Sequence, residues 1–326
     1  MRWMVTVEAT VDQAAVEVEL GAIGAVIDAE IEAVPLGEDE RVIYVEGPKD
    51  LARNLGDATP HLLAAYPDSE MEPYGTTDSG SRDDATGLGA GVGTMSEKLA
   101  IDREGDVVVL TMDDGRANAL GPDLTAAISA AVAEASADES VVAIVLAGRD
   151  GRFSGGFDLD VIGGGDVGAI GAMVTAGGSL VRQLYGCDVP VIAACTGHAV
   201  AAGALLLLGC DVRIGPDASV KIGLNEVAIG MTLPGWALTI AGERLSKRHL
   251  QRSIVNARLV DGNGGVDAGF LDQVVVPDAV IDAAIAEAKT MAALDRSAYV
   301  KTVAAVRGEV LATMDRQLAA DRADFE

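Results

Sequence analysis

The stretch Phe-Ser-Gly-Gly-Phe-Asp-Leu, residues 153–159, says more about the fold than any other segment of the chain. It follows an apolar run typical of a buried strand, residues 141–146, and a glycine-flanked turn at 148–151. Paired glycines after a strand let the backbone turn sharply and bring an N–H group close to a ligand. Such an N–H group can stabilise a developing oxyanion. The simpler alternative is that the glycine pair only makes a turn.

A second segment repeats the order of strand, small-residue loop and helix. Residues 190–195 form another short apolar run, and residues 196–211 continue it as a loop followed by an apolar helix. A helix N-terminus presents free N–H groups at the positive end of the helix dipole. The two segments together therefore predict two N–H groups directed at one carbonyl oxygen.

One carboxylate, Glu226, lies inside the apolar segment 222–230. Burial raises the pKa of a carboxyl group toward neutrality, which suits a group that takes up and returns a proton. We interpret Glu226 as the catalytic acid/base, and the alternative is a structural glutamate bonded to nearby backbone. His198 is an auxiliary candidate, because imidazole exchanges protons near neutral pH. Its alternative is a loop histidine that bonds to the backbone.

Composition divides the chain into a small module (1–75), a linker rich in glycine, serine and threonine (76–95), an α/β core (96–240) and a helical C-terminal region (241–326). In the module, a β-α-β-β-α-β order favours a ferredoxin-like α+β sandwich. The strands are predicted at 3–9, 25–34, 41–46 and 70–74, and the helical segments at 11–20, 49–55 and 60–66.

Strands and helices alternate in the core, which favours an α/β architecture. The core strands are predicted at 106–112, 141–146, 189–194 and 211–214, and the core helices at 122–137, 168–185 and 201–209. After about residue 238 the pattern is mostly helical, with helices predicted at 246–255, 262–269, 280–293 and 297–323.

The charge and composition exclude several classes of protein. A net charge of −26 argues against partners such as nucleic acid and anionic membrane surfaces. No apolar run is long enough to span a membrane, and the N-terminal residues carry no signal-peptide core, so we expect a cytoplasmic protein with no membrane insertion. The three cysteines are too scattered for a metal site or a disulfide framework.

From about residue 96 onward the chain resembles the crotonase (enoyl-CoA hydratase/isomerase) superfamily. The resemblance rests on four motifs in order: Asn118-Ala119-Leu120, residues 153–159, residues 196–206 and Ile222-Gly223-Leu224-Asn225-Glu226. It implies a crotonase-like spiral of ββα units whose helical C-terminal region builds homotrimers or hexamers. It also implies an acyl-CoA thioester substrate, with no cofactor apart from that coenzyme A. The N–H groups of Phe157 and Ala202 would form the oxyanion hole.

Hydratases of this superfamily use two glutamates, and the resemblance places one at Glu226 and the other at Leu205. Leucine cannot transfer a proton, so the chain looks more like the mitochondrial-type Δ3,Δ2-enoyl-CoA isomerases, which keep one glutamate. We therefore expect an acyl-CoA double-bond isomerase. One alternative is an enoyl-CoA hydratase that uses Glu226 with His198 or a water relay. A second is another reaction of the same scaffold, such as dehalogenation, decarboxylation or thioester hydrolysis. A third is a protein that binds acyl-CoA without catalysis.

The remaining residues expected to contact the acyl-CoA come from the same motifs. They are Arg116, Ala117, Asn118, Leu120, Gly155, Gly156, Asp158 and Leu205. Ala202 stands where the family usually has glycine. Alanine suits a helix start, but a positive φ at this position would strain it.

Overall fold

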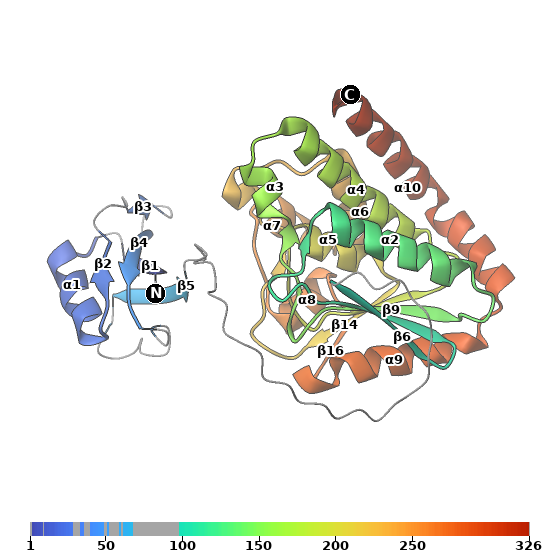
Figure 1. Ribbon diagram of the computed structural model, residues 1–326, viewed down its shortest axis with the longest axis horizontal. Coiled ribbons are helices and arrows are strands. Elements are labelled where there is room, and N and C mark those ends of the chain that lie inside the picture. Colours follow the sequence, from blue (N-terminus) through green and yellow to red (C-terminus); the bar gives the residue numbers. More distant parts are fainter. Residues whose placement is uncertain are drawn as a thin grey trace, which may run out of the picture. The chain divides into compact units, whose positions relative to one another are not determined.

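The computed structural model describes residues 2–8, 10–28, 33–35, 40–48, 51, 59, 61–67 and 98–325. The chain forms two compact units, Met1–Leu88 and Gly89–Glu326 (Figure 1). Each unit has its own hydrophobic core.

In the first unit a small antiparallel sheet packs against one described helix. Its elements are β1 (Arg2–Glu8), α1 (Gln13–Ala22), β2 (Val26–Ile27), β3 (Val34–Pro35), β4 (Glu40–Glu46) and β5 (Leu62–Pro67). The strand order is β2-β4-β1-β5, with β3 beside β4. Because side chains alternate along a strand, Trp3, Val5 and Val7 all face the core, where Val16 and Leu20 of α1 meet them. The combination of a sheet and a helix agrees with the α+β module predicted from the sequence, apart from β5.

One prediction for this unit is wrong. Residues 60–66 were predicted to be helical, but β5 occupies Leu62–Pro67 and pairs antiparallel with β1. A short apolar run fits a strand or a helix equally well by its pattern, and here the ladder with β1 decides. The predicted strand at 70–74 and the linker lie outside the described residues, as does the helix at 49–55 apart from Leu51.

The second unit is built on a six-stranded sheet of order β16-β14-β12-β9-β7-β6. Its strands are β6 (Leu99–Glu104), β7 (Val107–Met112), β9 (Ala143–Ala147), β12 (Val191–Ala194), β14 (Val212–Pro216) and β16 (Gln273–Val275). Only the β6–β7 pair is antiparallel among these neighbours. The sequence did not predict β16, which extends the sheet within the mostly helical C-terminal region.

Helices cover both faces of this sheet (Figure 1). They are α2 (Pro122–Ala137), α3 (Leu159–Gly163), α4 (Val167–Tyr185), α5 (Ala202–Gly209), α6 (Gly235–Arg244), α7 (Leu250–Ile254), α8 (Gly262–Ala268), α9 (Val280–Thr290) and α10 (Arg296–Phe325), with 3₁₀ turns η2 (Glu226–Ile229), η3 (Pro277–Ala279) and η4 (Met291–Ala293). Helix α9 packs on one face. Along β7, Val107 and Val109 point to that side, whereas Val108, Leu110 and Met112 point to the larger core under α2, α4 and α5.

A second, smaller sheet carries the loops named in the sequence analysis. Strands β10 (Gly151–Ser154), β13 (Gly197–Val200) and β15 (Ile222–Gly223) run parallel in the order β10-β13-β15. Beside them, β8 (Ala119–Leu120) pairs in parallel with β11 (Gly156–Phe157). This pairing joins the early Asn-Ala-Leu loop to the glycine pair.

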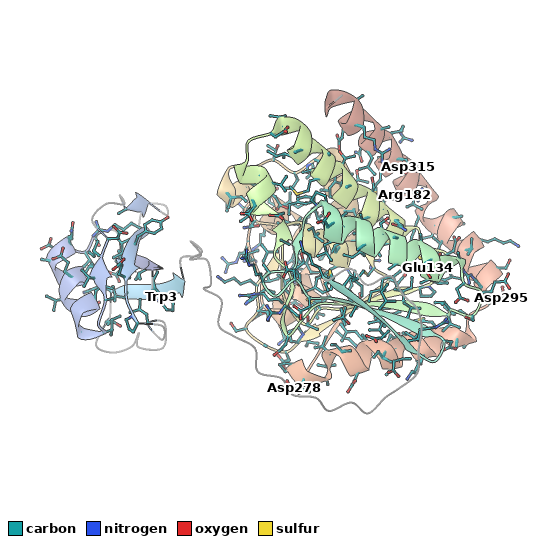
Figure 2. All side chains as sticks on the ribbon, in the orientation of Figure 1. Trp3, Glu134, Arg182, Asp278, Asp295 and Asp315 are labelled. Carbon is teal, nitrogen blue, oxygen red and sulfur yellow. The ribbon has the colours of Figure 1, made fainter. Side chains whose placement is uncertain are left out.

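Helix α10 packs along α4 and α6 of its own chain (Figure 1). Arg307 forms an ion pair of 2.6 Å with Asp211, and both side chains are largely buried. Figure 2 shows a second, more exposed pair, Arg182 on α4 with Asp315 on α10, at 2.7 Å. The helix is therefore a cap on its own subunit, and its predicted role between subunits stays a prediction. Among the described residues, none of the helices is both long and apolar enough to cross a membrane.

Candidate active site

The three parallel strands of the small sheet end side by side, and a candidate functional segment follows each end. Strand β10 leads into Gly155, Gly156 and Phe157, and β13 leads into Ala201 and Ala202. Strand β15 leads through Leu224 and Asn225 to Glu226. Because parallel strands present their carboxyl ends at one edge, the register brings the three segments together.

The first two segments are in direct contact. Gly156 has φ +101°, and a Cβ atom built on it would lie 2.9 Å from Cβ of Ala201 and 3.4 Å from the amide N of Ala202. Both the backbone angle and the lack of space require glycine here. The amide of Phe157, one residue on, is thereby held close to the start of α5.

Ala202 begins helix α5 and has no positive φ, so it does not carry the backbone strain that alanine would have there with a positive φ. That strain falls instead on Ala201, at φ +53° and ψ −126°, whose N–H donates to the carbonyl of Gly223 at 2.9 Å. The first N–H groups of a helix have no acceptor within the helix. The amide of Ala202 is therefore available to an oxygen atom outside α5.

Phe157 is fixed from two sides. Its backbone pairs with Leu120 of β8, and its ring lies against α4. A Cβ atom on Gly177 of that helix would lie 2.4 Å from the ring, so this glycine makes room for the aromatic side chain. The residue that supplies the candidate N–H group is therefore locked in place by packing.

Glu226 opens the 3₁₀ turn that follows β15 and is half-buried. Its Oε2 atom is buried and has no hydrogen-bond partner, and the same holds for Oδ1 of the preceding Asn225. Burial raises the pKa of the Glu226 carboxyl above its ordinary value. A carboxylate with an orphaned oxygen and a raised pKa is suited to accept a proton from a bound molecule.

His198 lies away from this edge. It sits opposite Arg152 in the register of β13 and β10, four residues before Ala202. Its Nδ1 accepts a hydrogen bond of 2.7 Å from the backbone N–H of Lys221, just before β15. Burial, with the nearby charges of Arg152 and Lys221, lowers the pKa of the imidazole. The arrangement favours a neutral histidine that bonds to the backbone.

The early loop is tied together by Asn118, which is fully buried at φ +51°. Its side-chain amide donates to the carbonyl of Met112 at 2.9 Å and to those of Arg152 and Phe153 at 3.2 Å. Arg116 is exposed on the same loop. The structure thus gives Asn118 a clear structural role and leaves Arg116 free to face a solute.

The other predicted contact residues take up varied positions. Ala117 accepts a hydrogen bond of 2.7 Å from the N–H of Gly155. Asp158 caps α3 by accepting from the N–H of Asp160. Leu120 and Leu205 are both buried in the main core. Ala117, Gly155 and Gly156 therefore lie together, while Asp158 shapes the loop.

Two residues support the site through bonds that the sequence did not predict. Ser154, the last residue of β10, is fully buried and bonds both to the early loop and to Gly156. Asp114 accepts from the N–H groups of Asn118, Ala119 and Arg116. Burial alone would raise the pKa of Asp114, but these three donors hold it below its ordinary value. The sequence signals are that Ser154 lies within the stretch 153–159 and that Asp114, an expected turn residue, shortly precedes the Asn118-Ala119-Leu120 motif.

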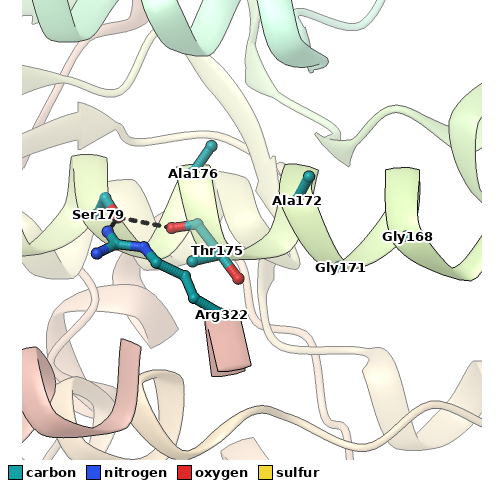
Figure 3. Close-up of a pocket in the computed structure, with 7 residues that line it drawn as sticks. All are labelled: Gly168, Gly171, Ala172, Thr175, Ala176, Ser179 and Arg322. Carbon is teal, nitrogen blue, oxygen red and sulfur yellow. Dashed lines mark hydrogen bonds between the residues drawn. The ribbon is translucent and has the colours of Figure 1, made fainter. Parts of the chain in front are cut away.

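A groove of about 390 Å³ lies elsewhere, along α4 beside the end of α10 (Figure 3). It is lined by Gly168, Gly171, Ala172, Thr175, Ala176, Ser179 and Arg322. None of the predicted site residues lines it. In the part of the chain that the structure describes, no cluster of three or more histidine, cysteine or acidic residues could hold a metal ion.

Comparisons with known proteins identify relatives of the second unit. The sequence model described as enoyl-CoA hydratase/isomerase matches residues 102–326. A "Probable enoyl-CoA hydratase" of Rhizobium meliloti (strain 1021) is 29% identical over 241 residues, covering 71% of this chain and 89% of that protein. An apo structure from Mycobacterium tuberculosis, described as an enoyl-CoA isomerase, is 37% identical with a TM-score of 0.66 and covers 70% of this chain and 99% of that one.

A second structure of the same mycobacterial protein, described as a probable enoyl-CoA hydratase, is also 37% identical. It has a TM-score of 0.67 and covers 70% of this chain and 96% of that one. The relatives are thus enzymes of one family, described as hydratase or isomerase. With a match that runs from residue 102 to the C-terminus, the chain belongs to the enoyl-CoA hydratase/isomerase family.

Proposed function

We propose that this chain is an acyl-CoA double-bond isomerase that converts a 3-enoyl thioester into the 2-enoyl thioester. The observation that carries the proposal is the lone, half-buried carboxylate of Glu226, whose Oε2 has no partner. It follows the strand next to the one that leads into Ala202. Where family hydratases carry a second glutamate, the chain has the buried, apolar Leu205.

The reaction needs one group that moves a proton and one site that stabilises negative charge. Glu226 removes a proton from C2, and the electrons of the C–H bond move toward the thioester oxygen. The N–H groups of Phe157 and Ala202 donate to that oxygen in the dienolate, and each such donor is worth on the order of 3 kcal/mol. Glu226 then returns the proton to C4. Coenzyme A takes part only as a portion of the substrate.

A hydratase is the second candidate, because of one specific observation. Asn225 and Glu226 are adjacent and each has a buried acceptor oxygen without a partner. A water molecule can donate to two acceptors, so such a pair suits a bound nucleophilic water. Under this alternative Glu226 takes a proton from the water as the water oxygen bonds to C3 of a 2-enoyl thioester, and a proton returns from Glu226 to C2.

The deciding experiment gives the purified protein a trans-3-enoyl-CoA and, separately, a trans-2-enoyl-CoA, and follows the absorbance of the conjugated enoyl group. Isomerisation raises the absorbance from the 3-enoyl substrate and leaves the 2-enoyl substrate unchanged. Rapid loss of the 2-enoyl absorbance instead establishes hydration. Glu226→Gln should abolish turnover, and Glu134→Gln on the exposed face of α2 is the matched control (Figure 2).

A third outcome separates an enzyme from a binding protein. Equal acyl-CoA affinity in wild type and Glu226→Gln, with no turnover in either, would mean that the chain binds acyl-CoA without converting it. The proposal also includes a homotrimer or hexamer in solution, which light scattering of the purified protein tests.

A further inference from the structure

A buried hydroxyl group links the early loop to the glycine pair. Ser154 ends β10 and has no exposed surface. Its Oγ donates to the carbonyl of Asn118 at 2.8 Å and accepts from the N–H of Gly156 at 3.2 Å. The hydroxyl therefore fixes the peptide group directly before the one that carries the N–H of Phe157.

The same residue touches the other donor segment. A Cβ atom built on Gly203 would lie 2.3 Å from the carbonyl oxygen of Ser154 and 2.8 Å from its Cβ. Gly203 directly follows Ala202 in the first turn of α5. Ser154 is therefore held between the segments of Phe157 and Ala202, and its position sets their separation.

The far end of this link is rigid. Asn118, the acceptor of the Ser154 hydroxyl, is itself fully buried and held by its own side-chain bonds to the carbonyls of Met112 and Phe153. Asp114 accepts from the N–H of Asn118 at 2.8 Å. An anchored acceptor gives the hydroxyl one preferred orientation, and so one preferred place for Gly156.

We propose that Ser154 is a positioning residue that aligns the N–H groups of Phe157 and Ala202 on one thioester oxygen. The inference rests on the proposed oxyanion hole but not on which reaction the hole serves. Gly156 has no side chain to restrict its rotation, so its hydrogen bond to Ser154 takes over that restriction. Electrostatic stabilisation depends on donors that are aligned before charge develops.

Two variants and one control test the proposal. Ser154→Ala removes the hydroxyl, and Ser154→Cys keeps a donor and acceptor at the same position, but the S–H is a weaker donor and the sulfur is larger than oxygen. Ser253→Ala makes the same change at a buried serine on α7, outside the link. We expect Ser154→Ala to lower kcat by roughly tenfold to a hundredfold, as misplaced catalytic groups do. Ser154→Cys should lie between it and wild type, and Ser253→Ala should match wild type.

The readouts separate alignment from general damage. Calorimetric titration with hexanoyl-CoA, a saturated thioester, should show affinity changed by no more than about threefold, because ground-state binding needs little alignment. The infrared C=O stretch of bound hexanoyl-CoA should be lowered in wild type and should return toward its value in water in Ser154→Ala. A loss confined to affinity, or an unchanged C=O stretch in a folded Ser154→Ala protein, overturns the proposal.

The infrared experiment needs no turnover, so it also separates this inference from the proposed function. If wild type neither isomerises nor hydrates, but its bound thioester shows a lowered C=O stretch that Ser154→Ala relaxes, the proposed function fails and the positioning role stands. If Ser154→Ala does not fold, the same comparison between wild type and Ser154→Cys decides.

Discussion

Replacing Gly156 by alanine should damage the chain far more than the same change at Gly105. Both glycines have positive φ, +101° and +72°. Their surroundings differ, because a Cβ atom on Gly105 meets nothing within 4 Å, whereas one on Gly156 lies 2.9 Å from Cβ of Ala201 and 3.0 Å from the carbonyl oxygen of Val200. The pair therefore separates backbone strain from crowding.

The expected costs follow from these contacts. Alanine in a left-handed conformation costs about 1–2 kcal/mol, and this is the whole effect expected at Gly105. Crowding of a packed interior adds about 1–3 kcal/mol at Gly156, for a total of about 2–5 kcal/mol. The crowded atoms belong to β13 and the start of α5, so the backbone shift that removes the clash moves the amides of Phe157 and Ala202 apart. A shift approaching 1 Å at such groups lowers the rate on the order of a hundredfold.

Urea denaturation of the two variants gives the free energies of unfolding, and turnover of the preferred enoyl-CoA gives the activities. We expect Gly105→Ala to keep wild-type activity and Gly156→Ala to lose most of it while still folded. Equal stability losses in the two variants, or full activity in Gly156→Ala, would refute the reasoning that the two donor segments are in rigid contact.

Three further changes test other features of the structure. Ala201→Gly relieves a backbone conformation that costs alanine about 1–3 kcal/mol. After the entropy cost of glycine is subtracted, the free energy of unfolding measured in urea should rise by about 1 kcal/mol. A lower free energy of unfolding would show that the contacts of the Ala201 methyl group matter more than the strain. Glu226→Gln should raise the melting temperature at neutral pH. The folded chain holds the proton of Glu226 to higher pH than the unfolded chain does, so this carboxyl costs stability as pH rises above its unfolded pKa. The gain in melting temperature should therefore shrink toward acid pH, and a gain independent of pH would argue against burial as its cause. Asp211→Asn leaves the buried Arg307 without its ion pair and should lower the free energy of unfolding by about 3 kcal/mol, measured in urea. A loss below ~1 kcal/mol would mean that this ion pair contributes little to holding α10.

The elements with strong local signals could be predicted from the sequence. The helix over 122–137 is found with the same bounds as α2, where Gly121 precedes a proline at the first helical position. The buried strands β9 and β12 fall on continuous apolar runs. In these elements the local pattern and the contacts with the rest of the fold agree, so the local pattern alone is enough.

Other features depend on contacts between distant residues, and the sequence does not display these. Residues 62–67 become a strand because β1 offers them a ladder. The positive φ falls on Ala201 rather than Ala202 where the chain turns from β13 into α5, with the Ala201 N–H bonded to Gly223. Ser154 is one serine among many until its partners, Asn118 and Gly156, are known. The catalytic roles of Glu226, Phe157 and Ala202 stay predictions, although the structure brings their segments together.

The small parallel sheet has a consequence for how this enzyme could be altered. Each candidate functional segment follows a different strand, and the three strands pair with one another in parallel. The donor segment after β13 has no room for a new side chain, whereas an acid or base moved within the segment after β15 would meet the same pair of amide donors. The proton-moving group and the donor pair are therefore separable, so a library confined to the few positions after β15 explores new reactions while the donor pair stays fixed.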